Sequence, residues 1–264
     1  MNKNTNKKQR VFTCGDIHGS HKALVQVLER CGFDYENDKL ITIGDIVDGW
    51  GDSFMVVEEL LKIKDRIDII GNHDNWLTTF IETGIHDQAW GMGGLSTAKS
   101  YARGIGLDLK IQKVGNGFIL NLNSGDIPEA HKKFFKGQHK YYKDQDNNVF
   151  VHGGFNPTLP IGSQLAHSLM WDRHLWSKHL SIRDTSMRIL YAEEYNHIFI
   201  GHTSTTFCGS NEPLTIDKLT NLDTGAGGGG YLSIMDVNSR EFWQSDYVPD
   251  LYPDDEHHIN NFKR

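Results

Sequence analysis

The chain has 264 residues, of which 38% are hydrophobic and 23% charged, and its formal net charge of −7 is ordinary for a globular protein. The negative charge argues against extended nucleic-acid binding, no apolar run approaches the roughly 20 residues of a membrane helix, and three scattered cysteines argue against a disulfide framework. We expect a cytoplasmic protein without membrane partners, with a disordered N-terminal tail over residues 1–10, a single domain over 11–248 and a loose C-terminal tail over 249–264.

The first third of the sequence alternates short β-branched runs with helical patterns. Apolar residues such as Leu24, Val27 and Leu28 recur at the spacing of one helix face. The alternation predicts a βαβαβ arrangement. Strands are expected at Val11–Cys14, Leu40–Ile43 and Ile67–Ile70, and helices at His21–Cys31 and Ser53–Lys64.

The rest of the sequence gives weaker signals. Between Trp76 and Asp146 the pattern is mixed, with a helix at Ser96–Arg103, and we interpret this region as an insertion at the rim of a site. The region 165–194, rich in Trp and His, is a second candidate for shaping a pocket. Further strands are expected at Asn148–Val151 and His197–Ile200, and an antiparallel pair joined by a glycine run is expected at Leu219–Leu222 and Tyr231–Val237.

Five short motifs place a polar side chain beside glycine directly after an apolar strand. Loops at the carboxyl ends of strands converge on one crevice in open α/β sheets, so residues far apart in sequence can meet there. A single Asp-x-His would mean little, but five such motifs in order predict one site. The motifs are Gly15-Asp16-Ile17-His18-Gly19, Gly44-Asp45-Ile46-Val47-Asp48-Gly49, Gly71-Asn72-His73-Asp74, Val151-His152-Gly153-Gly154 and Gly201-His202-Thr203.

The motifs supply two carboxylates, an amide and three imidazoles, a mixed set of oxygen and nitrogen ligands. Such a set suits divalent manganese, iron or zinc better than calcium. One ion would be overfilled, whereas two ions about 3.5–4 Å apart could share Asp45 and leave room for a water. The expected cofactor is therefore two divalent metal ions, with manganese preferred and iron or zinc as alternatives. The candidate ligands are Asp16, His18, Asp45, Asn72, His152 and His202.

These motifs resemble those of the calcineurin-like metallophosphoesterases, specifically the phosphoprotein phosphatase family in its short bacterial and bacteriophage form. The resemblance runs from about Val11 to Val237. It implies an α/β fold, a metallophosphatase-type β-sandwich flanked by helices, with a dinuclear metal site at the carboxyl ends of the strands. It assigns Asp16, His18 and Asp45 to the first ion, and Asp45, Asn72, His152 and His202 to the second.

The resemblance also implies the residues that handle the substrate. His73 would protonate the leaving oxygen and Asp48 would orient His73, a pairing that general-acid catalysis favours. Arg173 lies in a segment similar to the family's Trp-x-Arg, which makes it the expected phosphate clamp. The alternatives are that Arg173 only stacks or pairs on the surface and that Asp48 only caps its own turn.

Two positions depart from the family pattern. The family has arginine directly after the residue that is Asp48 here, whereas this chain has Gly49 followed by Trp50. Losing such a charge-assisted contact costs about 1.5–3 kcal/mol, and Trp50 could instead offer a flat face to a base. Asp74 stands where protein phosphatases more often have glutamate.

The resemblance implies hydrolysis of phosphomonoesters by an activated water, of the phosphoserine or phosphothreonine type. The expected partner is a phosphorylated protein or a small phosphate ester. Gly49 and Trp50 motivate the alternative, a hydrolase of nucleotides or dinucleoside polyphosphates. A non-catalytic phosphate-binding module is the third reading, against which the intact His73 and Asp48 speak.

Overall fold

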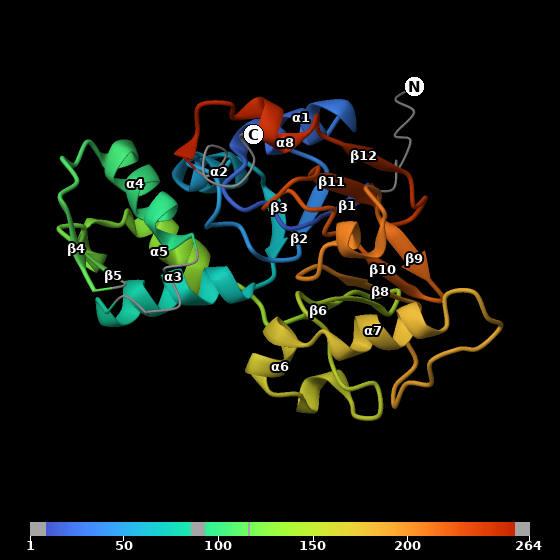
Figure 1. Cartoon of the computed structure of the whole chain (residues 1–264). Helices are drawn as coiled ribbons and strands as arrows, with labels where there is room; N and C mark the ends of the chain where they lie inside the picture. Colours follow the sequence, from blue (N-terminus) through green and yellow to red (C-terminus); the bar gives the residue numbers. More distant parts are fainter. Residues whose placement is uncertain (1–8, 86–92, 116, 257–264) are drawn as a thin grey trace, which may run out of the picture.

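The computed structural model describes residues 9–85, 93–115 and 117–256, which form two five-stranded sheets, a two-stranded sheet and surrounding helices (Figure 1). The first large sheet has the strand order β12-β11-β1-β2-β3. Its centre is parallel, because β1, β2 and β3 run in one direction, while β11 and β12 are antiparallel additions. The strands are β1 (Val11–Cys14), β2 (Lys39–Thr42), β3 (Asp65–Asp68), β11 (Ser233–Asp236) and β12 (Phe242–Gln244).

The second large sheet has the order β6-β7-β8-β10-β9. Again the central strands β7, β8 and β10 are parallel, and the edge strands β6 and β9 pair antiparallel with them. The two sheets therefore share one plan, with a parallel centre whose strand ends can supply ligands. The strands are β6 (Tyr142–Lys143), β7 (Asn148–Phe150), β8 (His197–Ile200), β9 (Leu214–Ile216) and β10 (Leu219–Asn221).

Helices cover the outer faces of both sheets. The crossovers α1 (His21–Arg30) and α2 (Ser53–Leu60) join the parallel strands of the first sheet, and α6 (Ala166–Trp171) and α7 (His174–Ser181) lie beside the second sheet (Figure 1). No helix within the described ranges has the length and apolarity needed to span a membrane. A lateral lobe contains α3 (Asn72–Thr83), α4 (Gly94–Ile105), α5 (Glu129–Lys136) and the hairpin of β4 (Ile111–Val114) and β5 (Gly117–Leu120).

The hydrophobic core is divided by the sheets into layers. A central cluster lies between the two sheets, where the rings of Phe150 and Phe199 stack with centroids 4.8 Å apart. Separate clusters lie beneath α1 and α2 and beneath α6 and α7. The expected β-sandwich flanked by helices is therefore confirmed. The central cluster consists of Ile41, Ile43, Ile69, Phe150, Phe199, Leu222, Met235 and Val237.

The expected antiparallel pairing of Leu219–Leu222 with Tyr231–Val237 is wrong. The first segment contributes β10 to the second sheet, whereas the second contributes β11 to the first sheet. Both strands are buried runs, so hydrophobic periodicity alone could not assign their partners. The glycine run between them passes from one layer of the sandwich to the other.

The C-terminal segment is packed rather than loose at its start. The helix α8 (Val248–Leu251) is followed by Tyr252, which is 5% exposed, stacks on Trp50 at a centroid distance of 5.2 Å and accepts the backbone N–H of Lys22. Trp50 is fully buried and its Nε1 donates to the Ala226 carbonyl, so the expectation that Trp50 offers a free face is wrong. Residues 1–8 and 257–264 lie outside the described residues.

We predict that Tyr252→Ala lowers the free energy of unfolding by about 3 kcal/mol, because it removes a buried aromatic ring that fills space against Trp50. Urea unfolding followed by far-ultraviolet circular dichroism measures this change. Phe207→Ala is the matched control, since Phe207 is 83% exposed and its removal should change stability by less than about 0.5 kcal/mol. Equal effects of the two substitutions would contradict the packing of this segment.

Candidate metal centre

The polar residues of the five motifs lie at the carboxyl ends of the parallel strands of both sheets. Asp16 and His18 follow β1, Asp45 follows β2, His152 follows β7 and His202 follows β8. Asn72 and His73 form the first turn of α3, just beyond β3. The two sheets meet at this edge, because the backbone N–H of His202 donates to Asp16 Oδ2 at 2.9 Å.

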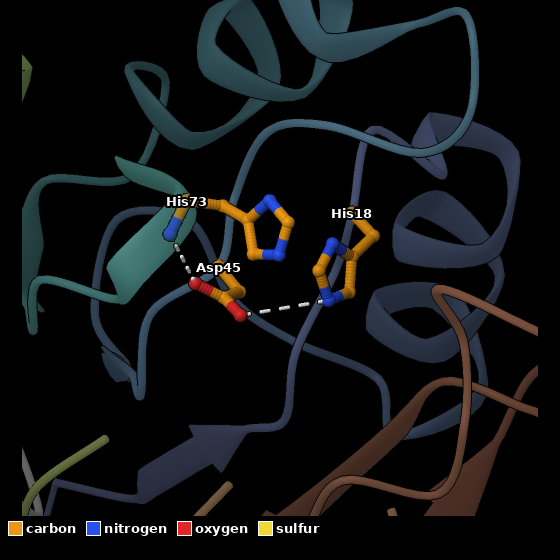
Figure 2. A group of neighbouring side chains, drawn as sticks. All are labelled: His18, Asp45 and His73. Atoms are coloured by element: carbon orange, nitrogen blue, oxygen red, sulfur yellow. Dashed lines mark hydrogen bonds and ion pairs between the residues drawn. The ribbon is translucent and has the colours of Figure 1, made fainter. Parts of the chain in front are cut away.

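Asp45 lies at the centre of the group. Its Oδ2 is 3.6 Å from His18 Nε2 and 3.3 Å from His152 Nε2, and its Oδ1 accepts the backbone N–H of His73 at 3.0 Å. Figure 2 shows the carboxylate between the His18 and His73 residues. One buried carboxylate thus contacts side chains or backbone from three other strand ends.

Two groups of side chains with metal-binding atoms share Asp45, and the first contains His73, which the family resemblance assigns as the general acid and not as a ligand. Potential ligand atoms of His18, Asp45 and His73 lie within 4.8 Å of one another, and so do those of Asp45, His152 and His202. Asn72 belongs beside the second group, since its Oδ1 is 3.1 Å from His152 Nε2.

Asp16 lies in neither group and contacts the second sheet instead. Its Oδ2 accepts from His202, while its Oδ1 is buried without a hydrogen-bond partner among the described residues. His202 Nε2 is likewise buried without a hydrogen-bond partner among the described residues. A buried oxygen or nitrogen with no partner is costly unless something else satisfies it, and a cation would do so at both atoms.

Hydrogen bonds to backbone carbonyls orient two of the imidazoles. His18 Nδ1 lies 3.0 Å from the Asp48 carbonyl, and His152 Nδ1 lies 2.8 Å from the Ile43 carbonyl. A carbonyl only accepts, so each Nδ1 is the donor and the neutral ring keeps its lone pair on Nε2. Both Nε2 atoms face Asp45, which is the arrangement that metal-binding histidines use.

Close approach of the backbone makes room for these side chains. A Cβ atom at Gly71 would lie 2.1 Å from Asp45 Oδ1, and one at Gly201 would lie 2.0 Å from Asp16 Oδ1. Only glycine fits at these two positions. The residues His18, Asp45, Asp48 and His202 also have positive φ angles of 49°, 50°, 67° and 67°, and such strain costs on the order of 1 kcal/mol per residue.

The electrostatics of the group favour a cation. Burial and the nearby charge of Asp223 raise the pKa of Asp16, and burial together with Asp45 raises the pKa of Asp223 to about 6. Burial opposes a charged His152, but Asp45 and Asp16 raise its pKa to about 10, while burial lowers the pKa of His202 to about 3. The nearby carboxylates thus keep the His152 imidazole protonated, and a bound divalent cation would replace this proton.

His73 is held by a buried carboxylate. Its Nδ1 donates to Asp48 Oδ2 at 2.9 Å, and Asp48 is fully buried. Asp48 Oδ1 in turn accepts from Thr97 Oγ1 at 2.6 Å, which ties the pair to α4 in the lateral lobe. Burial would lower the pKa of His73, but the negative charges of Asp45 and Asp48 raise it. Thr97 could not be identified from the sequence, because it belongs to a helix outside every motif.

Asp74 connects two of the ligand-bearing loops. It is fully buried, its Oδ1 accepts from Ile46 N at 2.8 Å, and its Oδ2 accepts from Gly71 N at 3.0 Å and from Gln138 Nε2 at 2.9 Å. The loop after β2 and the loop after β3 are therefore held by one carboxylate. Gln138 follows α5 and no pattern in the sequence singled it out.

Arg173 lies beside His202, whereas Gly49 lies beside His18. The exposed Arg173 Nη1 donates to the His202 carbonyl at 3.0 Å and to Thr203 Oγ1 at 2.7 Å, so its guanidinium borders the second group. Gly49 has φ +104°, and a Cβ there would lie 3.1 Å from the His18 carbonyl oxygen. The positive φ angle would therefore strain any residue with a side chain at this position, arginine included.

Comparison with known proteins identifies relatives of this arrangement. The model of the family described as calcineurin-like phosphoesterase matches residues 9–205. Two curated proteins named symmetrical bis(5'-nucleosyl)-tetraphosphatase are similar, from Nitrosomonas europaea (31% identical over 78 residues) and from Buchnera aphidicola (40% over 77 residues). These matches span 29% of this chain and 29% and 28% of the two relatives.

Solved structures share the fold across most of the chain. A structure provisionally assigned as a diadenosine tetraphosphatase aligns with a TM-score of 0.59 and 18% identity, covering 90% of this chain and 94% of the other. A metallophosphoesterase from Sphaerobacter thermophilus aligns with a TM-score of 0.51 and 16% identity, covering 92% of this chain and 90% of the other. At such identities the likeness concerns the fold alone.

We predict that Asp74→Ala lowers the affinity for Mn²⁺ by about 10–100-fold, because the loops that carry Asp45 and Asn72 lose their common anchor. Isothermal titration calorimetry measures the affinity, and a thermal melt shows whether the variant is folded. The control is Asp184→Ala, which removes an exposed carboxylate and should leave the affinity unchanged. A folded Asp74→Ala protein with the wild-type affinity would contradict the anchoring role.

Proposed function

Because the chain belongs to the calcineurin-like phosphoesterase family, we propose that it is a metal-dependent hydrolase that cleaves dinucleoside polyphosphates. The observation that carries the chemistry is the pair of side-chain groups that share Asp45, the first of which contains His73. The substrate class is suggested by the relatives named symmetrical bis(5'-nucleosyl)-tetraphosphatase. Hydrolysis of a dinucleoside tetraphosphate between its two middle phosphates would consume one water and release two nucleoside diphosphates.

The residues present fit two divalent cations. We propose that His18, Asp16 and Asp45 hold one, and that Asp45, Asn72, His152 and His202 hold the other. The partnerless Asp16 Oδ1 and His202 Nε2, and the Nε2 atoms of His18 and His152 directed at Asp45, support this assignment. Bound cations, with manganese preferred, would supply an activated water and neutralise the phosphate charge.

His73 is proposed as the general acid that gives its proton to the leaving oxygen. The hydrogen bond from Nδ1 to Asp48 leaves Nε2 as the atom that can carry this proton outward. Asp48 stabilises the charged imidazole, and Thr97 holds Asp48 in place. Arg173 is proposed to bind a phosphate oxygen at the edge of the site, since its exposed guanidinium already borders His202.

The expectation of a phosphoserine or phosphothreonine phosphatase has weaker support than its alternative. The similar curated proteins named above are tetraphosphatases, and no arginine follows Asp48 to bind a phosphopeptide. Trp50 no longer supports a nucleotide substrate, because it is buried in the core. The intact hydrogen bond between His73 and Asp48 favours an enzyme over a non-catalytic phosphate-binding module.

With Mn²⁺ present, we expect kcat/KM to be higher for diadenosine tetraphosphate than for a phosphoserine peptide. Product analysis by ion-exchange chromatography should show adenosine diphosphate. Asp45→Asn should reduce turnover of both substrates to the detection limit, since Asp45 contacts both ligand groups. A preference for the phosphopeptide would contradict the proposed substrate, and Mn²⁺ binding without hydrolysis of any phosphate ester would contradict an enzyme.

We expect His73→Gln to lower kcat for phenyl phosphate by about 100-fold, within the range of general acids, and to lower it less for p-nitrophenyl phosphate. Phenol, with a pKa of about 10 like tyrosine, needs protonation as it leaves more than the more acidic p-nitrophenol does. His174→Gln, an exposed imidazole at the start of α7, is the matched control. The same loss for both esters would contradict the acid role.

A further inference from the structure

A row of aromatic rings joins the candidate general acid His73 to the candidate metal ligand His202. The ring of His73 is 4.6 Å from that of Trp76, Trp76 is 5.8 Å from Trp171, and Trp171 is 5.7 Å from His202. The ring of His167 stacks on Trp171 with centroids 5.9 Å apart and an angle of 19° between the planes. The row thus joins α3 of the lateral lobe to α6 beside the second sheet.

The rings of this row differ in their access to solvent. Trp76 is 6% exposed, so its faces are covered by the core. Trp171 is half-buried and His167 is exposed, so the stacked pair forms the accessible end of the row. His167 and the open part of Trp171 are therefore accessible to a ligand from solvent, whereas Trp76 is not.

The position of His73 indicates on which side of the site the leaving group lies. A general acid must lie within hydrogen-bond reach of the leaving oxygen, so the leaving group passes on the His73 side of the site. The next rings on that side are Trp76 and then Trp171. The leaving group of a dinucleoside polyphosphate is a nucleotide, whose phosphates precede a flat base.

A positive charge lies next to the aromatic pair in the sequence. Arg173 lies two residues after Trp171 and is exposed, so a cation for phosphate and a surface for stacking are adjacent in the chain. Stacking on an aromatic ring tolerates any base, because every base has a π-face. An aliphatic leaving group, such as a serine side chain, would gain little from two stacked rings.

We propose that Trp171 and His167 form a base subsite, at which the base of the leaving nucleotide stacks. The inference rests on the proposed function, because it takes the leaving group to be a nucleotide and His73 to be the acid that protonates it. The proposed metal centre would recognise only the phosphates. The base subsite would make the protein prefer nucleotides over polyphosphates that carry no base.

The test compares two probes that differ by the nucleoside, adenosine diphosphate and inorganic pyrophosphate, by isothermal titration calorimetry with Mn²⁺ present. We expect the wild-type protein to bind adenosine diphosphate about tenfold more tightly, a factor within the range of base stacking on one aromatic group. His167→Ala and Trp171→Ala should each lower this ratio several-fold, and Trp171→Phe should keep part of it because a ring remains.

The variants of Trp171 and His167 distinguish base stacking from a purely structural role of these side chains. If Trp171 only supported His202, Trp171→Ala would weaken both probes equally and leave the ratio at its wild-type value. His167 is exposed, so its variant should fold, and His174→Ala is the matched control that should keep the wild-type ratio. A wild-type ratio near one, or a ratio that both alanine variants leave unchanged, overturns the base subsite.

Failure of the substrate proposal gives a different result. If the wild-type protein prefers adenosine diphosphate and the two variants lose this preference, the base subsite stands even when diadenosine tetraphosphate is not hydrolysed. In that case only the proposed substrate is overturned. Binding is measured without turnover, so the outcome for the subsite does not depend on which ester is cleaved.

Discussion

The structure depends on one buried carboxylate, Asp45, held where the two sheets meet. A negative charge removed from water needs compensating groups at short distance. The histidines that approach Asp45 come from the ends of β1 and β7, and a backbone N–H comes from the start of α3. The sandwich brings these strand ends to one edge. Imidazoles or divalent cations are the positive groups that could compensate the buried carboxylate there.

Holding this group together imposes costs on the backbone. Four of its residues have left-handed conformations, and glycine is required at Gly71 beside Asp45 and at Gly201 beside Asp16. The packed layers on both sides of the sheets keep these conformations in place. Asp74, a buried carboxylate that is not a proposed ligand, joins two of the loops. Asp74 thus gives the loops after β2 and β3 a common anchor.

The lateral lobe and α6 give the site features that the metal ligands do not provide. Thr97 of α4 holds the carboxylate that orients His73, and Trp171 of α6 reaches the rings beside it. Both regions were predicted as the parts of the chain that border a site. Under the proposed function, substrate selectivity is expected to come from these parts, since the strand ends would hold the cations and the phosphate.

From the sequence one could predict most of the strands and which polar residues gather at one edge of the sheets, because several motifs with a polar residue beside glycine after a buried run point to a common edge. Which sheets β10 and β11 join, the packing of Trp50 against Tyr252 and the contact of Thr97 with Asp48 became visible only in the folded chain. These contacts join segments far apart in the chain. Buried strands and aromatic residues are apolar wherever they pack, so their identity does not encode their partners.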